Sequence, residues 1–191
     1  PGLEAGADGA VRIGTGGDDV LIGREGADIL AGLGGNDTIE GRGGDDIILA
    51  GGGENVIYGG AGHDRLLFTA PFNQFNFAVP EEDGPIVFTH LLGRLGKQTA
   101  HADVEEFVFT DVRLTREQLL GNVFIADTTS LVGTDGDDFL YARDFALQIE
   151  GRGGNDMIVG SPQGDYLFGG PGDDTIISGD GPDLVDGGTG N

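Results

Sequence analysis

Cysteine is absent from the 191 residues, which excludes disulfide bonds, thiol catalysis and thiolate metal sites. No apolar run approaches the ~18 residues that a membrane-spanning helix requires, so we expect no transmembrane segment. No basic-then-apolar signal opens the chain. Because the sequence starts abruptly at Pro1 and stops at Asn191 within a repeat, we expect it to be a fragment of a larger parent protein.

Basic residues are scarce. Ten Lys and Arg stand against 33 Asp and Glu, and the formal net charge is −23. Such a chain repels phosphates, so we expect no nucleic acid partner and no anionic membrane surface, whereas cations are favoured. A disordered acidic tail has a similar composition, but disorder does not explain the regular spacing described below.

Catalytic motifs are also missing. The sequence contains neither H-E-x-x-H nor G-x-S-x-G. His63, His90 and His101 are the only histidines, and none has the i, i+4 spacing of a metal pair. We expect His63 to be exposed in a turn, and the other two to be surface or half-buried residues rather than ligands. We therefore expect no enzymatic activity, no catalytic residue and no organic cofactor.

Glycine, by contrast, is abundant: its 39 residues are about one in five, against a usual share of about 7%. Between residues 14 and 67, nine-residue units follow one another without a slip. Their fourth position is always glycine, namely Gly17, Gly26, Gly35, Gly44, Gly53 and Gly62. Their sixth position carries Asp19, Asp28, Asp37, Asp46, Asn55 and Asp64. Their eighth position is aliphatic, namely Leu21, Leu30, Ile39, Ile48, Ile57 and Leu66.

After a gap the same period returns at Gly133. The sixth position now carries Asp138, Leu147, Asp156, Asp165, Asp174 and Asp183. The eighth position is again aliphatic, namely Leu140, Ile149, Ile158, Leu167, Ile176 and Val185. A seventh unit, residues 187–191, ends before its sixth position.

The residue types point to a cation-binding turn followed by a short strand. Glycines allow positive φ, so that carbonyl oxygens can face one hollow, and the aspartate adds a hard, charged oxygen that suits Ca²⁺. In the strand that follows, alternate side chains face opposite sides, so the eighth position points inward. The alternative for the aspartates is that each caps its own turn through backbone hydrogen bonds. Acids at the fifth position are expected to be solvated.

Units such as residues 41–49 (GRGGDDIIL) and 169–177 (GGPGDDTII) resemble the G-G-x-G-x-D-x-U-x nonapeptide of repeats-in-toxin (RTX, hemolysin-type) proteins. The resemblance implies an all-β fold, a parallel β-roll or β-solenoid with two nonapeptides per coil. It also implies Ca²⁺ between turns stacked 18 residues apart, with about seven ions in all. Each ion would take the aspartate and the carbonyls of positions two and four of one turn, and the aspartate and the carbonyls of positions one and three of the later turn.

Carried over to this chain, the ligand pairs are Asp19 with Asp37, Asp28 with Asp46, Asp37 with Asn55, Asp46 with Asp64, Asp138 with Asp156, Asp156 with Asp174, and Asp165 with Asp183. The carbonyls implied for the first block are those of Thr15, Gly17, Gly32, Gly34, Arg24, Gly26, Gly41, Gly43, Leu33, Gly35, Ala50, Gly52, Arg42, Gly44, Gly59 and Ala61. Those implied for the second block are Thr134, Gly136, Gly151, Gly153, Arg152, Gly154, Gly169 and Pro171.

Some units depart from the motif. Asn55 offers a neutral oxygen, so its site should be the weakest of the first block. Leu147 cannot ligate, so we expect no ordinary site between Leu147 and Asp165. Gln163 stands where the motif has glycine, and the unit from Ser178 has an acid at Asp180, which makes the Asp165/Asp183 pair the least regular.

The segment between the blocks is rich in phenylalanine. Alternation at Phe75, Phe77 and Val79, and at Phe107 and Phe109, predicts strands. Residues 115–118 have the form of a capping box, which predicts a short helix over the following two leucines. The stretch ADVEEFVFTD (102–111) resembles the strand that often follows RTX blocks. We expect a small sheet that packs on the open end of the first roll, because a solenoid exposes its core at its ends.

The predicted organisation is an N-terminal linker or edge (1–13), a first roll (14–67), a β-rich capping segment with a short helix (68–132) and a second roll (133–191). The resemblance implies a calcium-binding module that folds on meeting extracellular Ca²⁺, in a secreted bacterial protein that uses type I secretion machinery. Two alternatives remain: a ligand- or glycan-binding module of an adhesin or secreted enzyme or toxin, and the inert tail of an enzyme.

Overall fold

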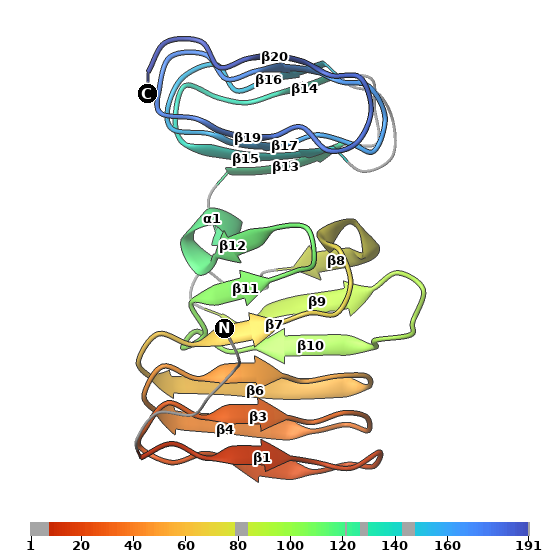
Figure 1. Cartoon of the computed structure of the whole chain (residues 1–191), viewed down its shortest axis with the longest axis vertical. Helices are drawn as coiled ribbons and strands as arrows, with labels where there is room; N and C mark the ends of the chain where they lie inside the picture. Colours follow the sequence, from red (N-terminus) through yellow and green to blue (C-terminus); the bar gives the residue numbers. More distant parts are fainter. Residues whose placement is uncertain (1–7, 79–83, 121, 127–129, 143–147, 191) are drawn as a thin grey trace. The chain divides into compact units, whose positions relative to one another are not determined.

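A computed structural model describes residues 8–78, 84–120, 122–126, 130–142 and 148–190. The predictions that concern residues 1–7, Val79, Leu147 and Asn191 lie outside these ranges. The chain divides into two compact units, Pro1–Arg116 and Glu117–Asn191. Each is a stack of short strands (Figure 1).

The first unit contains two six-stranded sheets, with strand orders β1-β3-β5-β7-β11-β12 and β2-β4-β6-β10-β9-β8. The strands are β1 (Val11–Ile13), β2 (Val20–Ile22), β3 (Ile29–Ala31), β4 (Thr38–Gly43), β5 (Ile47–Leu49), β6 (Glu54–Ala61), β7 (Arg65–Leu67), β8 (Phe75–Ala78), β9 (Ile86–His90), β10 (Lys97–Ala100), β11 (Glu106–Val108) and β12 (Arg113–Thr115). Within the repeats every neighbouring pair is parallel and offset by 18 residues. The predicted β-roll is confirmed.

The eighth position of each repeat forms the core between the two sheets. Leu30 pairs with Ile48, and Ile48 with Leu66, so that the same position stacks on itself from coil to coil. These three side chains are at most 1% exposed. Burial of such stacked aliphatic groups contributes roughly 1.5–3 kcal/mol per side chain, which ties neighbouring coils together.

The Phe-rich segment caps the roll by extending both of its sheets rather than by forming a separate sheet. Strand β10 pairs in parallel with β6, and β11 pairs in parallel with β7, as if one more coil had been added (Figure 1). Strands β9 and β8 and strand β12 then add antiparallel edges. Between them lies a buried aromatic cluster in which Phe68 stacks on Phe109 at 4.3 Å.

One short helix, α1 (Arg116–Leu120), follows β12, where the capping box predicts it. A 3₁₀ turn, η1 (Phe72–Gln74), precedes β8. No helix in the described residues is long and apolar enough to cross a membrane.

The second unit is a roll of two four-stranded, wholly parallel sheets, β13-β15-β17-β19 and β14-β16-β18-β20. Its strands are β13 (Asn122–Ala126), β14 (Ser130–Val132), β15 (Asp138–Ala142), β16 (Gln148–Glu150), β17 (Met157–Val159), β18 (Tyr166–Phe168), β19 (Thr175–Ile177) and β20 (Leu184–Asp186). Its core again consists of eighth-position residues such as Ile149, Ile158 and Leu167, all 0% exposed. Strands β13 and β14 provide a first coil before the repeats begin.

Candidate metal sites

The sixth-position residues lie in the turns that enter the strands, and most of them are buried. Asp46 and Asp64 are 0% exposed, and Asp28, Asp37 and Asn55 are 1% exposed. Carboxylates are normally exposed unless they are paired or bound to metal, so these side chains require an explanation.

The structure brings together all seven predicted pairs. In each pair the backbone N–H of the earlier residue donates to Oδ1 of the residue 18 positions later. The distances are 2.9 Å for Asp19–Asp37, 2.7 Å for Asp28–Asp46, 2.7 Å for Asp37–Asn55, 2.8 Å for Asp46–Asp64, 2.9 Å for Asp138–Asp156, 2.9 Å for Asp156–Asp174 and 3.0 Å for Asp165–Asp183. One carboxylate oxygen therefore fixes the stacking of the turns.

The second carboxylate oxygen has no partner at five of the turns. Oδ2 is buried and without a hydrogen bond in Asp37, Asp46, Asp64, Asp156 and Asp174. A buried acceptor that is left unsatisfied costs about 1–3 kcal/mol, and more when it is charged. Five such atoms in repeated positions form a pattern that a bound cation would satisfy.

A backbone carbonyl faces the same hollow. An added Cβ on Gly14 would lie 2.7 Å from Asp19 Oδ2 and 2.7 Å from the carbonyl oxygen of Gly32. The first-position carbonyls predicted as ligands all have this relation to the aspartate of the turn before them, namely Gly32, Gly41, Ala50, Gly59, Gly151 and Gly169. Glycine at the first position keeps this hollow open, because a Cβ there would meet both oxygens. Ala50, Ala142 and Ser178 are the described exceptions at this position.

The other predicted carbonyls are engaged differently. Those of Thr15, Arg24, Leu33 and Thr134 accept amide hydrogens from Gly34, Gly43, Gly52 and Gly153 respectively. Those of Ala61 and Pro171 accept from Gly44 and Gly154. The fourth-position glycines stack so tightly that a Cβ on Gly35, Gly44 or Gly154 would clash with the backbone of Gly17, Gly26 or Gly136. The role of all these carbonyls as ligands, including those of Arg42 and Arg152, stays a prediction.

Burial also changes the acidity of these carboxyls. It raises the pKa of Asp46 to about 7 and that of Asp64 and Asp156 to about 6, and it raises the pKa of Asp37. The amide hydrogen bond from the preceding turn opposes this change, and neighbouring carboxylates add to it. A divalent cation in the hollow would stabilise the ionised form.

Four turns support the alternative, in which an aspartate caps its own turn. Oδ2 of Asp19 accepts from the Thr15 N–H at 2.6 Å, and the N–H groups of Arg24, Thr134 and Ser161 act in the same way on Asp28, Asp138 and Asp165. None of these four second-position residues is among the described non-glycine residues with positive φ, whereas Leu33, Arg42 and Arg152 have a left-handed second position. Capping and an open oxygen therefore go with different backbone conformations of the turn.

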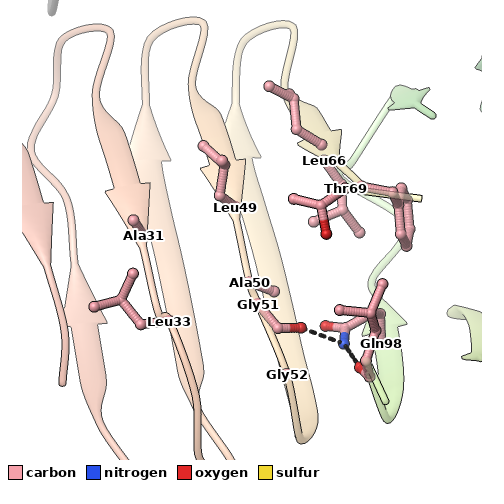
Figure 2. Close-up of a pocket in the computed structure, with 12 residues that line it drawn as sticks. Ala31, Leu33, Leu49, Ala50, Gly51, Gly52, Leu66, Thr69 and Gln98 are labelled. Atoms are coloured by element: carbon pink, nitrogen blue, oxygen red, sulfur yellow. Dashed lines mark hydrogen bonds between the residues drawn. The ribbon is translucent and has the colours of Figure 1, made fainter. Parts of the chain in front are cut away.

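The irregular units have local explanations. Asn55 Nδ2 donates to Gln98 Oε1 at 3.0 Å. Gln98 Nε2 in turn donates to the carbonyls of Gly51 at 3.1 Å and Leu95 at 2.8 Å (Figure 2). The Gln98 amide thus lies at the end of the stack of turns that contains Asn55, and it lines an apolar cavity of about 270 Å³. Asp183 is half-buried and Asp180 is exposed.

The motif analysis missed a second ladder, at the fifth position. Asp18 Oδ1 accepts from the Asn36 N–H at 2.7 Å, and Asn36 Oδ1 accepts from the Glu54 N–H at 2.8 Å. Asp45 and Asp137 make the same bond to the turn 18 residues later. The frequency of Asp and Asn at this position is the signal that predicts it.

The histidines take no part in the turns' hollows. His63 is exposed, as predicted, and His101 is half-buried and stacks on Tyr58 at 4.1 Å. His90 is more deeply buried than expected, and it contacts Gln74 Oε1 at 3.2 Å. Across the described ranges, no three His, Cys, Asp or Glu side chains gather to hold a metal by themselves. Any ion at the turns therefore needs carbonyl ligands as well.

A family model described as RTX calcium-binding nonapeptide repeat matches residues 13–48, 32–66, 127–144, 132–167 and 159–191, which is more than half of the chain. The chain belongs to the RTX family. Calcium is therefore the metal implied for the RTX turns, and the unsatisfied carboxylate and the facing carbonyl are the hard oxygens that it prefers.

Other comparisons add little about these RTX repeats. No curated protein matches the chain. Among solved structures, the crystal structure of extracellular lipase LipA from Serratia marcescens matches 91% of this chain and 28% of that chain, with 24% sequence identity and a TM-score of 0.36. This chain thus spans less than a third of that structure, and a likeness at this TM-score carries no argument about function.

Proposed function

We propose that this chain is a non-enzymatic module that folds on binding extracellular Ca²⁺ and stabilises a larger secreted protein. The observation that carries the proposal is the buried and unpartnered Oδ2 atom that recurs at five turns. Each lies beside a carbonyl oxygen in a hollow that a Cβ on the first-position glycine of its own turn would enter. The seven predicted pairs, from Asp19/Asp37 to Asp165/Asp183, are the proposed sites for about seven ions.

Calcium would supply the free energy that the bare chain lacks. Strands of three residues bury little surface, and glycine-rich turns lose much conformational entropy on folding. Stacked carboxylates repel one another as well. An ion that joins two turns and neutralises their charge converts binding energy into folding energy.

The affinity expected of such sites places folding outside the cell. Extracellular calcium modules have Kd values of about 10⁻⁴ to 10⁻³ M, far above the free calcium concentration of a cytosol. The chain would remain unfolded inside, pass through type I secretion machinery and fold after export. Residues 14–67 and 133–191 would be the two calcium-folded blocks, and residues 68–132 would cap and connect them.

Far-UV circular dichroism during a calcium titration from a chelated start tests the proposal, with magnesium as the control. We expect a cooperative gain of β-structure near millimolar calcium and no comparable gain with magnesium, which dehydrates reluctantly and demands octahedral geometry. A chelated chain already rich in β-structure would contradict the folding role. Catalytic turnover by this chain alone would contradict the non-enzymatic role.

A further inference from the structure

The capping segment reproduces a repeat turn at one edge of the first roll. Glu106 pairs with Arg65, so Glu105 lies in the register position of Asp64, one coil later. The Asp64 N–H donates to Glu105 Oε2 at 2.7 Å, just as the Asp46 N–H donates to Asp64 Oδ1 at 2.8 Å. Glu105 thus continues the ladder of sixth-position carboxylates, although no nonapeptide precedes it.

The same loop also supplies the carbonyl that a repeat turn would supply. A Cβ on Gly59 would clash with both Asp64 Oδ2 and the Asp103 carbonyl oxygen, which is the arrangement of the first position in the repeats. Asp64 is 0% exposed, and its Oδ2 has no hydrogen-bond partner. Asp103 accepts from the Gly60 N–H at 3.1 Å through Oδ2, while its Oδ1 is buried and also without a partner.

The loop is fixed from the other side by the cap. The Arg116 N–H donates to the Glu105 carbonyl at 2.7 Å, and the Arg116 guanidinium donates to the His101 carbonyl at 3.1 Å. Val104, between the two acids, is 0% exposed. The loop that carries Asp103 and Glu105 is therefore held against Asp64 by packing and by backbone hydrogen bonds.

The opposite edge of the roll ends in a different way, which makes the contrast informative. There Gln98 pairs with Asn55 one coil later, and its amide donates to the Gly51 carbonyl of the last repeat turn and to the Leu95 carbonyl of its own loop. A neutral amide satisfies that end, and no carboxylate of the cap lies in the ladder. At the Asp64 edge the cap instead adds the carboxylates of Asp103 and Glu105, and Asp64 Oδ2 and Asp103 Oδ1 are left without a donor.

We propose that Asp64, Asp103 and Glu105 hold a further calcium ion between the last repeat and the capping segment. The inference rests on the proposed function, because it assumes that the repeat turns bind calcium. The side chains do not converge on one point by themselves, so the Asp103 carbonyl completes the site. Three carboxylates in place of two give it more charge than a repeat site, and affinity in calcium sites rises with ligand charge.

The test counts calcium ions bound per chain at saturation by equilibrium dialysis. The double variant Asp103→Asn/Glu105→Gln keeps oxygen acceptors for the Gly60 and Asp64 amides but removes two charges. We expect it to bind one ion fewer than the unaltered chain. The matched control Glu40→Gln/Glu54→Gln removes two exposed charges and should bind the unaltered number.

Circular dichroism at saturating calcium checks that each variant is folded. If the double variant does not fold, the count is made on the two single variants, in which we expect the affinity of one ion to fall by at least about tenfold. An unaltered count and affinity in the variants would overturn this inference while leaving the proposed function intact. An unaltered chain that binds no calcium would overturn the proposed function itself.

Discussion

The second position of several turns has a left-handed backbone even where the residue is bulky. Leu33, Arg42 and Arg152 have φ angles of 76°, 83° and 80°. A residue with a Cβ loses roughly 1–2 kcal/mol in this conformation, whereas Gly51 adopts it at the same position without that cost. The stacked turns, and the ions proposed between them, hold these residues in a conformation that they would not adopt alone.

Replacing Arg42 by glycine should therefore stabilise the calcium-bound fold. The relief of roughly 1–2 kcal/mol exceeds the extra entropy of an unfolded glycine, about 0.5–1 kcal/mol. The exposed Arg42–Glu40 ion pair contributes little. We expect the free energy of unfolding, from urea denaturation in saturating calcium, to rise by about 0.5–1 kcal/mol.

Arg24→Gly is the matched control for this substitution. Arg24 stands at the same position of a first turn, and it is not among the described non-glycine residues with positive φ. It has no strain to lose, so its replacement should lower the free energy of unfolding by up to about 1 kcal/mol. Equal shifts in the two variants would show that the left-handed conformation is not the cause.

Strand β10 shows how an element without the repeat motif can end a metal-binding edge. Its Gln98 is 2% exposed, and its amide nitrogen donates to the carbonyls of Gly51 and Leu95 (Figure 2). A donor group thus replaces the cation proposed for the turns below it. The Gln98 amide is therefore satisfied at this edge of the cap without a metal ligand.

Two substitutions of Gln98 should show whether its amide donor does at this edge what a cation is proposed to do in the turns. Gln98→Met removes the donor and should destabilise the fold by about 1–3 kcal/mol at every calcium concentration, because carbonyl acceptors are left unsatisfied. Gln98→Glu places a carboxylate beside the same carbonyls, so its destabilisation should shrink as calcium rises. Urea denaturation at a series of calcium concentrations measures the destabilisation of each variant. If the two variants depended on calcium in the same way, the idea that the Gln98 amide takes the place of an ion would be contradicted.

The sequence predicts the repeat strands and turns well, and it predicts poorly how the capping segment continues them. The period of nine predicts the strands, the buried Leu30 and Ile48, and the stacking of Asp28 on Asp46, because each repeat carries the same local signal. The contacts of Gln98 and Asp103 join residues 43 positions apart, and no local pattern records such a pairing. An acid immediately before a strand, as at Glu105, was the available signal, since most repeat strands also follow an acid, at the sixth position.

Across each roll, the metal-free fold holds protons more tightly than the unfolded chain does. The pKa of Asp46 is raised to about 7 and that of Asp64 and Asp156 to about 6, against about 3.9 for an unfolded aspartate. The stabilisation that comes from protonation is complete below the unfolded value and is lost as pH rises through the folded values. Calcium requires the ionised carboxylates, so its binding strengthens over the same range.

Acidification should therefore partly replace calcium. In chelator, lowering the pH from roughly 8 to about 5 should increase the β-signal in far-UV circular dichroism, while calcium affinity should fall over the same interval. Asp46→Asn/Asp64→Asn should flatten this dependence, because its amides are neutral at every pH. Glu40→Gln/Glu54→Gln, which removes two exposed charges, should retain it.

If both double variants kept the full dependence, the effect would come from the net charge of −23 rather than from the buried turns. If the chelated chain lost β-structure on acidification, the buried carboxyls would not be what destabilises the metal-free rolls.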